Sequence, residues 1–156
     1  MYIIRRAENK DIDSCIELLK QVCNVHAKIR PDLFKSGMTK YNKEELEQIF
    51  KSDNDPVFVY EENNKVLGYG FCKITIFDGK LHPKRIKTLY IDDICIDEHN
   101  RGKHIGKAIF EYIIEYAKSI GCYNVTLNVW EGNDGAKKFY EAMGMFSEKI
   151  TMEKLI

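Results

Sequence analysis

Residues 101–107 form a basic, glycine-containing segment, RGKHIGK, between a strand-like run and a long amphipathic, helix-like run. The first turn of a helix has main-chain N–H groups without intrahelical partners and carries the positive end of the helix dipole. Glycine lets a ligand approach the backbone closely, and Lys and Arg add full positive charges. The segment matches neither GxxxxGK(S/T) nor GxGxxG. It nevertheless predicts a pyrophosphate site, with a basic helix start that binds no ligand as the alternative.

Two adjacent carboxylates, Asp92 and Asp93, lie in the strand-like run TLYIDDICI at residues 88–96. Since neighbouring side chains of a strand point to opposite faces, we expect one carboxylate to reach a cleft and the other to turn away. A carboxylate in a cleft can attract the ammonium form of an amine and take its proton through water. A surface or capping carboxylate is the alternative interpretation.

The composition limits the possible partners. The 156 residues include 24 Lys+Arg and 24 Asp+Glu, and this zero net charge gives no indication of a nucleic-acid or membrane partner. No apolar run approaches the roughly 20 residues that span a bilayer, and the start of the chain lacks a signal-peptide pattern. Five cysteines without a CxxC pair fit free thiols, so a cytoplasmic location is expected. The histidines lack metal-ligand spacing, so no metal site is expected.

Hydrophobic periodicity and turn residues predict the elements that position these groups. Strands are expected at residues 2–6, 57–60, 66–77, 87–96, 123–130 and within 145–156, and helices at 11–29, 43–51, 105–119 and 134–143. Residues 79–83 are expected to form a loop. Because no repeat or linker divides the chain, we predict one α/β (α+β) domain over residues 1–156, with a central mixed sheet and helices on both faces.

Two motifs carry a resemblance to a known family. The run IDDICIDEHNRGKHIGKAIFEYIIEYAKSIGC, residues 91–122, resembles the acetyl-CoA-binding signature of the GNAT superfamily of N-acetyltransferases, Arg/Gln-x-x-Gly-x-Gly/Ala between a strand and a helix. The run NDGAKKFYEAMGM, residues 133–145, is similar to the second signature of that family, Asn-x-x-Ala-x-x-Phe-Tyr-x-x-x-Gly-Phe. The resemblance covers residues 88–146 in motif and most of the chain in element order.

The resemblance implies acetyl-CoA as the cofactor, bound where two central parallel strands splay apart. Main-chain groups of Ile94, Cys95 and Ile96 would pair with the pantetheine arm, and Asn133 would hydrogen-bond that arm. Tyr140 would lie near the thioester sulfur and protonate the departing thiolate, whereas a core aromatic is its alternative role. The pyrophosphate would be held by Arg101, Gly102, Lys103, His104, Ile105, Gly106 and Lys107.

The resemblance also implies candidates for the acceptor side. Family members that act on polyamines and aminoglycosides have an acid at the position of Asp92, so we expect Asp92 to be the base, with Asp93 as the second candidate. Asn128 stands where some relatives have a glutamate; it can orient a substrate but is no base. His26 lies in the region that covers the acceptor site and is a candidate for substrate contact, with a partly exposed helix histidine as the commoner alternative.

His104 departs from the family pattern, which usually has glycine at this position. A left-handed backbone at His104 would cost on the order of 1 kcal/mol, whereas an ordinary φ would cost nothing. We expect the turn to accept His104 with an ordinary φ.

The resemblance therefore implies an N-acetyltransferase in which a primary amine attacks acetyl-CoA directly. A small polyamine-like or aminoglycoside-like amine is the expected acceptor. A protein or peptide N-acetyltransferase and a non-catalytic acyl-CoA-binding module are the alternatives. Many relatives pair as homodimers through their last strands, so a homodimer is possible here.

Overall fold

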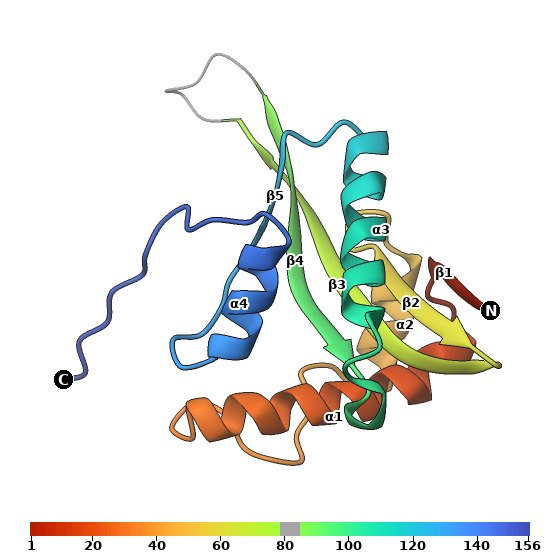
Figure 1. The fold of residues 1–156 in the computed structure, drawn as a ribbon, viewed down its shortest axis with the longest axis horizontal. Helices are drawn as coiled ribbons and strands as arrows, with labels where there is room; N and C mark the ends of the chain where they lie inside the picture. The colour runs from red at the N-terminus through yellow and green to blue at the C-terminus, as the bar shows by residue number, and fades with distance from the viewer. Residues whose placement is uncertain (79–84) are drawn as a thin grey trace.

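A five-stranded mixed sheet forms the centre of the computed structural model, which describes residues 1–78 and 85–156 (Figure 1). The strands lie in the order β1-β2-β3-β4-β5, antiparallel except for the parallel pair β4–β5. Their bounds are β1 (Tyr2–Arg6), β2 (Val57–Glu62), β3 (Lys65–Phe77), β4 (Ile86–Ile96) and β5 (Asn124–Leu127). The predicted mixed sheet is confirmed.

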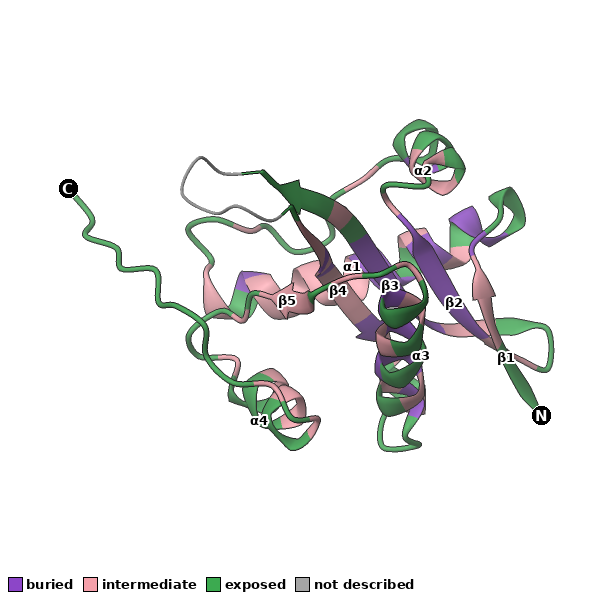
Figure 2. Cartoon of the chain, turned by 90° about the horizontal axis from the view of Figure 1, so that it is seen from above, coloured by how far each residue is buried: buried purple, intermediate pink, exposed green. Residues whose placement is uncertain are grey.

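Helices cover both faces of this sheet, as predicted (Figure 2). The four helices are α1 (Ile12–Ile29), α2 (Lys43–Lys51), α3 (Ile105–Ser119) and α4 (Asp134–Ala142). Helices α1 and α2 contribute to one buried cluster, and α3 contributes to a second cluster that α4 adjoins. Strand β2 supplies both clusters in alternation, because Val57 and Val59 face α1 whereas Phe58 faces α3.

Close packing of α3 on β3 depends on a glycine in the strand. A Cβ at Gly70 would lie 2.6 Å from Cδ1 of Ile113 and 3.1 Å from Cγ2 of Ile109. Both isoleucines belong to the buried stripe of α3, which recurs at helical spacing. The absent side chain therefore lets the middle of α3 lie directly against the sheet.

Two irregularities of β4 shape the middle of the sheet. The β3–β4 register shifts between Phe71 and Cys72, so that Asp92 is an extra residue in β4. The parallel pairing with β5 ends at Ile91↔Leu127, although β4 continues to Ile96. Within the described residues, the last five residues of β4 therefore have no strand partner on the β5 side. This is the predicted splay.

The expected elements are confirmed to within about two residues, with two exceptions. Strand β5 ends at Leu127, earlier than the predicted strand 123–130, because β4 and β5 diverge there. The prediction of final strands within 145–156 is wrong for the single chain, because no strand in residues 1–78 or 85–144 pairs with this segment. The predicted loop 79–83 lies outside the described residues. No helix in the described ranges is long and apolar enough to cross a membrane.

Candidate active site

The start of α3 presents a group of free main-chain donors. No main-chain N–H of residues 101–107 donates a hydrogen bond to any residue that the structure describes, and the first N–H to do so is that of Ala108, to His104 O at 3.1 Å. The side chains of Arg101, Lys103 and Lys107 are exposed around these amides. Free amides, the positive end of the helix and three cations form a donor set that fits a diphosphate.

His104 has a left-handed backbone, with φ 61° and ψ 16°. The expectation of an ordinary φ is therefore wrong. The chain reverses sharply between β4 and α3, and this turn uses left-handed conformations at both Gly102, with φ 79°, and His104. The exposed His104 side chain makes no capping hydrogen bond that would offset the strain.

We expect His104→Gly to raise the free energy of unfolding by about 1 kcal/mol, because glycine adopts a left-handed backbone without strain. Urea denaturation of the two proteins measures this difference. His99→Gly is the matched control, because His99 is also exposed but has an ordinary φ. Glycine there should be neutral or destabilising, so equal effects of the two changes would contradict strain at His104.

The last five residues of β4 have no strand partner on the β5 side among the described residues. They would contact a ligand in the splay mainly through their main chain. Ile94 and Ile96 are partly buried against the α3 cluster. The Cys95 side chain is buried on the other face, where Sγ lies 3.4 Å from Leu18 O. Burial raises the pKa of the Cys95 thiol, so it stays protonated. A ligand in the splay would therefore meet main-chain groups of Ile94–Ile96, and no reactive thiolate.

Helix α4 carries Tyr140 and Asn133 beside the splay. The Tyr140 ring packs against Phe110 and Phe139, with centroid distances of 6.1 and 5.1 Å, whereas its hydroxyl has no hydrogen-bond partner among the described residues. Burial, with a smaller contribution from the Asp93 carboxylate, raises the pKa of Tyr140. The hydroxyl is therefore a protonated donor. Asn133 Oδ1 caps α4 by accepting from Ala136 N at 3.3 Å, which leaves its amide NH2 group for another partner.

Both carboxylates of the acidic pair lie on the α1/α2 face of the sheet. Asp93 is the register partner of Phe71 and accepts a 2.5 Å hydrogen bond from Tyr69, and both aromatic residues belong to the α1 cluster. Asp92 shares a pocket with Tyr41 and Phe71. The expectation that the pair points to opposite faces is wrong, because the bulge inserts Asp92 and breaks the alternation of β4.

The two carboxylates have different surroundings. Burial raises the pKa of Asp93 to about 6, against the opposing effect of the Tyr69 hydrogen bond. Asp92 instead accepts two hydrogen bonds from Lys40 Nζ, at 2.8 and 2.7 Å, and one from the Tyr41 hydroxyl at 3.3 Å. Asp92 lines a cavity of 290 Å³ that the sheet forms together with residues 40–41, Ile49 of α2 and Asp55.

Side chains predicted to contact an acceptor lie on the same side of the sheet. The His26 ring packs against Phe34 at 5.2 Å, and Phe34 packs edge-on against Trp130 at 5.7 Å. Burial, followed by the charge of Lys40, lowers the pKa of His26, so its ring is neutral near pH 7. Asn128 Nδ2 donates to the Tyr90 hydroxyl at 3.2 Å, and Tyr90 lines the Asp92 cavity.

No pattern in the sequence predicted a role for Lys40, Tyr41 or Tyr69. The sequence around Tyr69 is typical of an ordinary buried strand. The contact of Tyr69 with Asp93 depends on the register of β3 and β4. Lys40 and Tyr41 lie in a segment without regular structure, 52 and 51 residues away from Asp92. No local pattern in the sequence marks such a contact.

Comparison with known proteins places these features in a family. The model of the acetyltransferase (GNAT) family matches residues 3–145. The chain is 40% identical over 68 residues to glucosamine 6-phosphate N-acetyltransferase of Arabidopsis thaliana, covering 44% of each protein. It is 30% identical over 148 residues to an N-acetyltransferase of Methanocaldococcus jannaschii, covering 95% of this chain and 62% of that protein. The chain thus spans less than two thirds of the length of either relative.

Solved structures share the whole fold. A mutant protein from Bacillus halodurans is 34% identical, with a TM-score of 0.92 and coverage of 99% of both chains. Glucosamine-6-phosphate N-acetyltransferase from Arabidopsis thaliana is 29% identical, with a TM-score of 0.72 and coverage of 99% of this chain and 98% of that chain.

Proposed function

Because the chain belongs to the acetyltransferase (GNAT) family, we propose that it transfers the acetyl group of acetyl-CoA to a primary amine by direct attack in a ternary complex. The observation that carries this proposal is the set of free amides at residues 101–107, which lies just beyond the unpaired end of β4. A diphosphate and a peptide-like arm attached to it would find donors at these two adjacent places.

Acetyl-CoA would supply the activated acetyl group. Residues 101–107 would bind its diphosphate, and the main chain of Ile94–Ile96 would pair with the pantetheine arm as a strand would. Asn133 would donate its free amide N–H to the same arm. The amides of residues 101–107 and the NH2 group of Asn133 have no other partner among the described residues, so binding to them would not break an internal hydrogen bond. On β4, the Ile96 carbonyl oxygen accepts from Arg101 Nε at 3.4 Å, and the pantetheine arm would replace this contact.

The acceptor would arrive mostly as an ammonium ion, since an alkylamine has a pKa near 10.4. Asp92 would hold this ammonium in the cavity and remove its proton through a bridging water. Main-chain N–H groups near Ile94–Ile96 would polarise the thioester carbonyl, and Tyr140 would donate its proton to the leaving sulfur. Much of the rate would come from holding the amine and the thioester together.

A small amine is the acceptor that the cavity favours. Its volume of 290 Å³ lies near the lower end of the range for small-molecule sites. Relatives include proteins named for glucosamine 6-phosphate and for spermine as acceptors, both of which are small amines. A protein N-terminus or lysine is the alternative acceptor and would need an open groove.

Calorimetry with CoA and a screen for acetyl transfer test this function. The screen measures release of CoA from acetyl-CoA with spermine, aminoglycosides, glucosamine 6-phosphate and N-terminal peptides. We expect CoA to bind and at least one small amine to release it. Binding of CoA without release by any amine would favour the non-catalytic module, and failure to bind CoA would overturn the proposal.

We also propose that two chains pair through their last residues. Residues 146–156 extend away from the sheet (Figure 1) and make no main-chain hydrogen bond to the described residues; their ion pair with the rest of the chain joins Glu153 to Arg30 at 3.2 Å. Exposed apolar side chains recur along this tail. They are Phe146, Ile150, Met152, Leu155 and Ile156.

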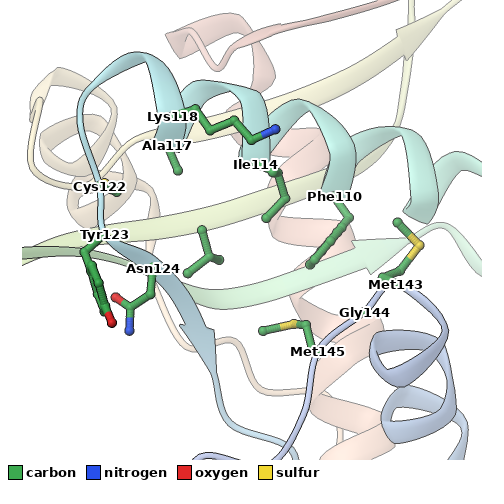
Figure 3. Close-up of a pocket in the computed structure, with 11 residues that line it drawn as sticks. Phe110, Ile114, Ala117, Lys118, Cys122, Tyr123, Asn124, Met143, Gly144 and Met145 are labelled. Carbon is green, nitrogen blue, oxygen red and sulfur yellow. The ribbon is translucent and has the colours of Figure 1, made fainter.

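The surface that would receive the tail of the second copy is the edge of β5 that faces away from β4. This edge of the sheet has no strand partner within residues 1–78 and 85–156, and beside it Phe110, Ile114, Val125 and Met145 line a pocket of 320 Å³ (Figure 3). An unpaired edge and an unpaired apolar tail in one chain suit exchange of tails between two copies.

We expect Ile150→Asp to convert a dimer into a monomer, because it places a charge on the apolar face of the exchanged tail. Analytical ultracentrifugation across a range of protein concentrations measures the change. Thr151→Asp is the matched control, since neighbouring residues of a strand point to opposite faces. A wild-type protein that stays monomeric at all concentrations would contradict the proposed exchange.

A further inference from the structure

We propose that Lys40 is a built-in counter-ion of Asp92 that the acceptor amine must displace, and that it selects acceptors carrying their own anionic group. This inference rests on the proposed function, because it concerns the carboxylate that would hold the acceptor ammonium. It names the acceptor class more narrowly, as a small amine that also bears a phosphate or carboxylate.

Lys40 occupies the two oxygens that an acceptor ammonium would need. Its Nζ lies 2.7 and 2.8 Å from the Asp92 oxygens and 5.4 Å from the ring centroid of Tyr41. The Asp92 side chain is 19% exposed, whereas that of Lys40 is 56% exposed. The carboxylate is thus fixed in the wall of the cavity, and the ammonium lies on the solvent side, where another cation can replace it.

The backbone that carries Lys40 is fastened to α1. Gly37 N donates to Asn24 Oδ1 at 2.8 Å, and Cys23 Sγ lies 3.3 Å from Lys35 O. These two contacts hold residues 35–37 of the segment between α1 and α2 against the helix. Lys40 therefore reaches Asp92 from a positioned segment, and when its ammonium is displaced it remains beside the cavity.

Displacement by a simple amine exchanges one cation for another at Asp92. The new ion pair replaces the old one, and Lys40 is left as a second positive charge next to the bound ammonium, which is unfavourable. An acceptor that also carries an anionic group gives the released Lys40 a new partner. The number of ion pairs then rises from one to two. A polycation such as spermine has no group that could play this part.

Matched acceptor pairs and a charge-removing variant test this inference. The pairs are glucosamine with glucosamine 6-phosphate, and 2-aminoethanol with 2-aminoethyl phosphate; propylamine with β-alanine tests a carboxylate in place of a phosphate. We expect the wild-type protein to prefer an anionic member by about tenfold in kcat/KM, the effect of one charged hydrogen bond. Lys40→Met should abolish this preference by raising the KM of the anionic amine and lowering that of its neutral partner.

Two further variants separate selectivity from a loss of structure. Lys40→Arg keeps the charge and should restore the preference. Lys43→Met removes the cation paired with Asp13 at 2.9 Å, on the exposed surface nearby, and should leave the preference unchanged. An unchanged preference in Lys40→Met, or a wild-type protein that prefers the neutral amines, would overturn the inference.

Binding measurements keep this test independent of turnover. Calorimetry of the same acceptor pairs in the presence of CoA gives their dissociation constants, and the ratio should again fall about tenfold in Lys40→Met. If this ratio falls but no amine releases CoA, the proposed function fails and the role of Lys40 stands. If amines are acetylated with the same preference in both proteins, the role of Lys40 fails alone.

Discussion

Tyr140→Phe should lower kcat by roughly 100-fold, the size of effect typical of a positioned general acid, and leave the affinity for acetyl-CoA nearly unchanged. The substitution removes only the hydroxyl, and the ring that packs against Phe110 and Phe139 is retained. Since the hydroxyl has no hydrogen-bond partner among the described residues, its loss leaves no internal group unsatisfied. The defect should therefore appear in kcat rather than in stability.

Steady-state kinetics at saturating substrates and calorimetry with CoA separate the two quantities. Tyr123→Phe is the matched control, because Tyr123 is 77% exposed and lies away from the splay. Burial raises the pKa of Tyr140, so its proton is retained throughout the usual assay range and the loss in kcat should not depend on pH. An unchanged kcat would refute Tyr140 as the proton donor.

Local patterns were sufficient to locate the group of free amides at residues 101–107. The strand before residues 101–107 and the helix after them follow from hydrophobic periodicity, and free amides follow from any helix start that lacks a capping side chain. The conformation of His104 did not follow, because φ depends on how far the chain must turn between β4 and α3. That turn joins two elements whose relative placement depends on the packing of the whole fold, which no local pattern contains.

The surroundings of Asp92, where the acceptor amine would bind, could not be predicted from local patterns. They are made by residues that lie far apart in the sequence. One extra residue in β4 moved Asp92 to the same face as Asp93, and a simple alternation rule cannot detect a bulge whose partner strand is unknown. Lys40 comes from an irregular segment and meets Asp92 only in the folded chain. The tail at residues 146–156 has a strand-like pattern, but a strand exists only where a second one pairs with it.

Asp92→Asn should lower kcat/KM for amine acceptors by roughly 1,000-fold, because one change removes both the base and the charge that attracts the ammonium. Lys40 would then lose the partner that it holds at 2.7 Å, and its free charge would repel the incoming cation. The loss in kcat/KM should come partly from a higher KM for the amine and partly from a lower kcat. The affinity for CoA should remain, since residues 101–107 are unaltered.

Asp93→Asn is the matched control, one residue away on the same face of the sheet. The asparagine oxygen can still accept the Tyr69 hydrogen bond, so the local structure should persist. Because burial raises the pKa of Asp93 to about 6, a base role for Asp93 would make kcat/KM rise with pH through about 6, as the carboxyl group ionises. If that rise disappears in Asp93→Asn together with most of the activity, and Asp92→Asn affects mainly KM, then Asp93 is the base and Asp92 only positions the amine.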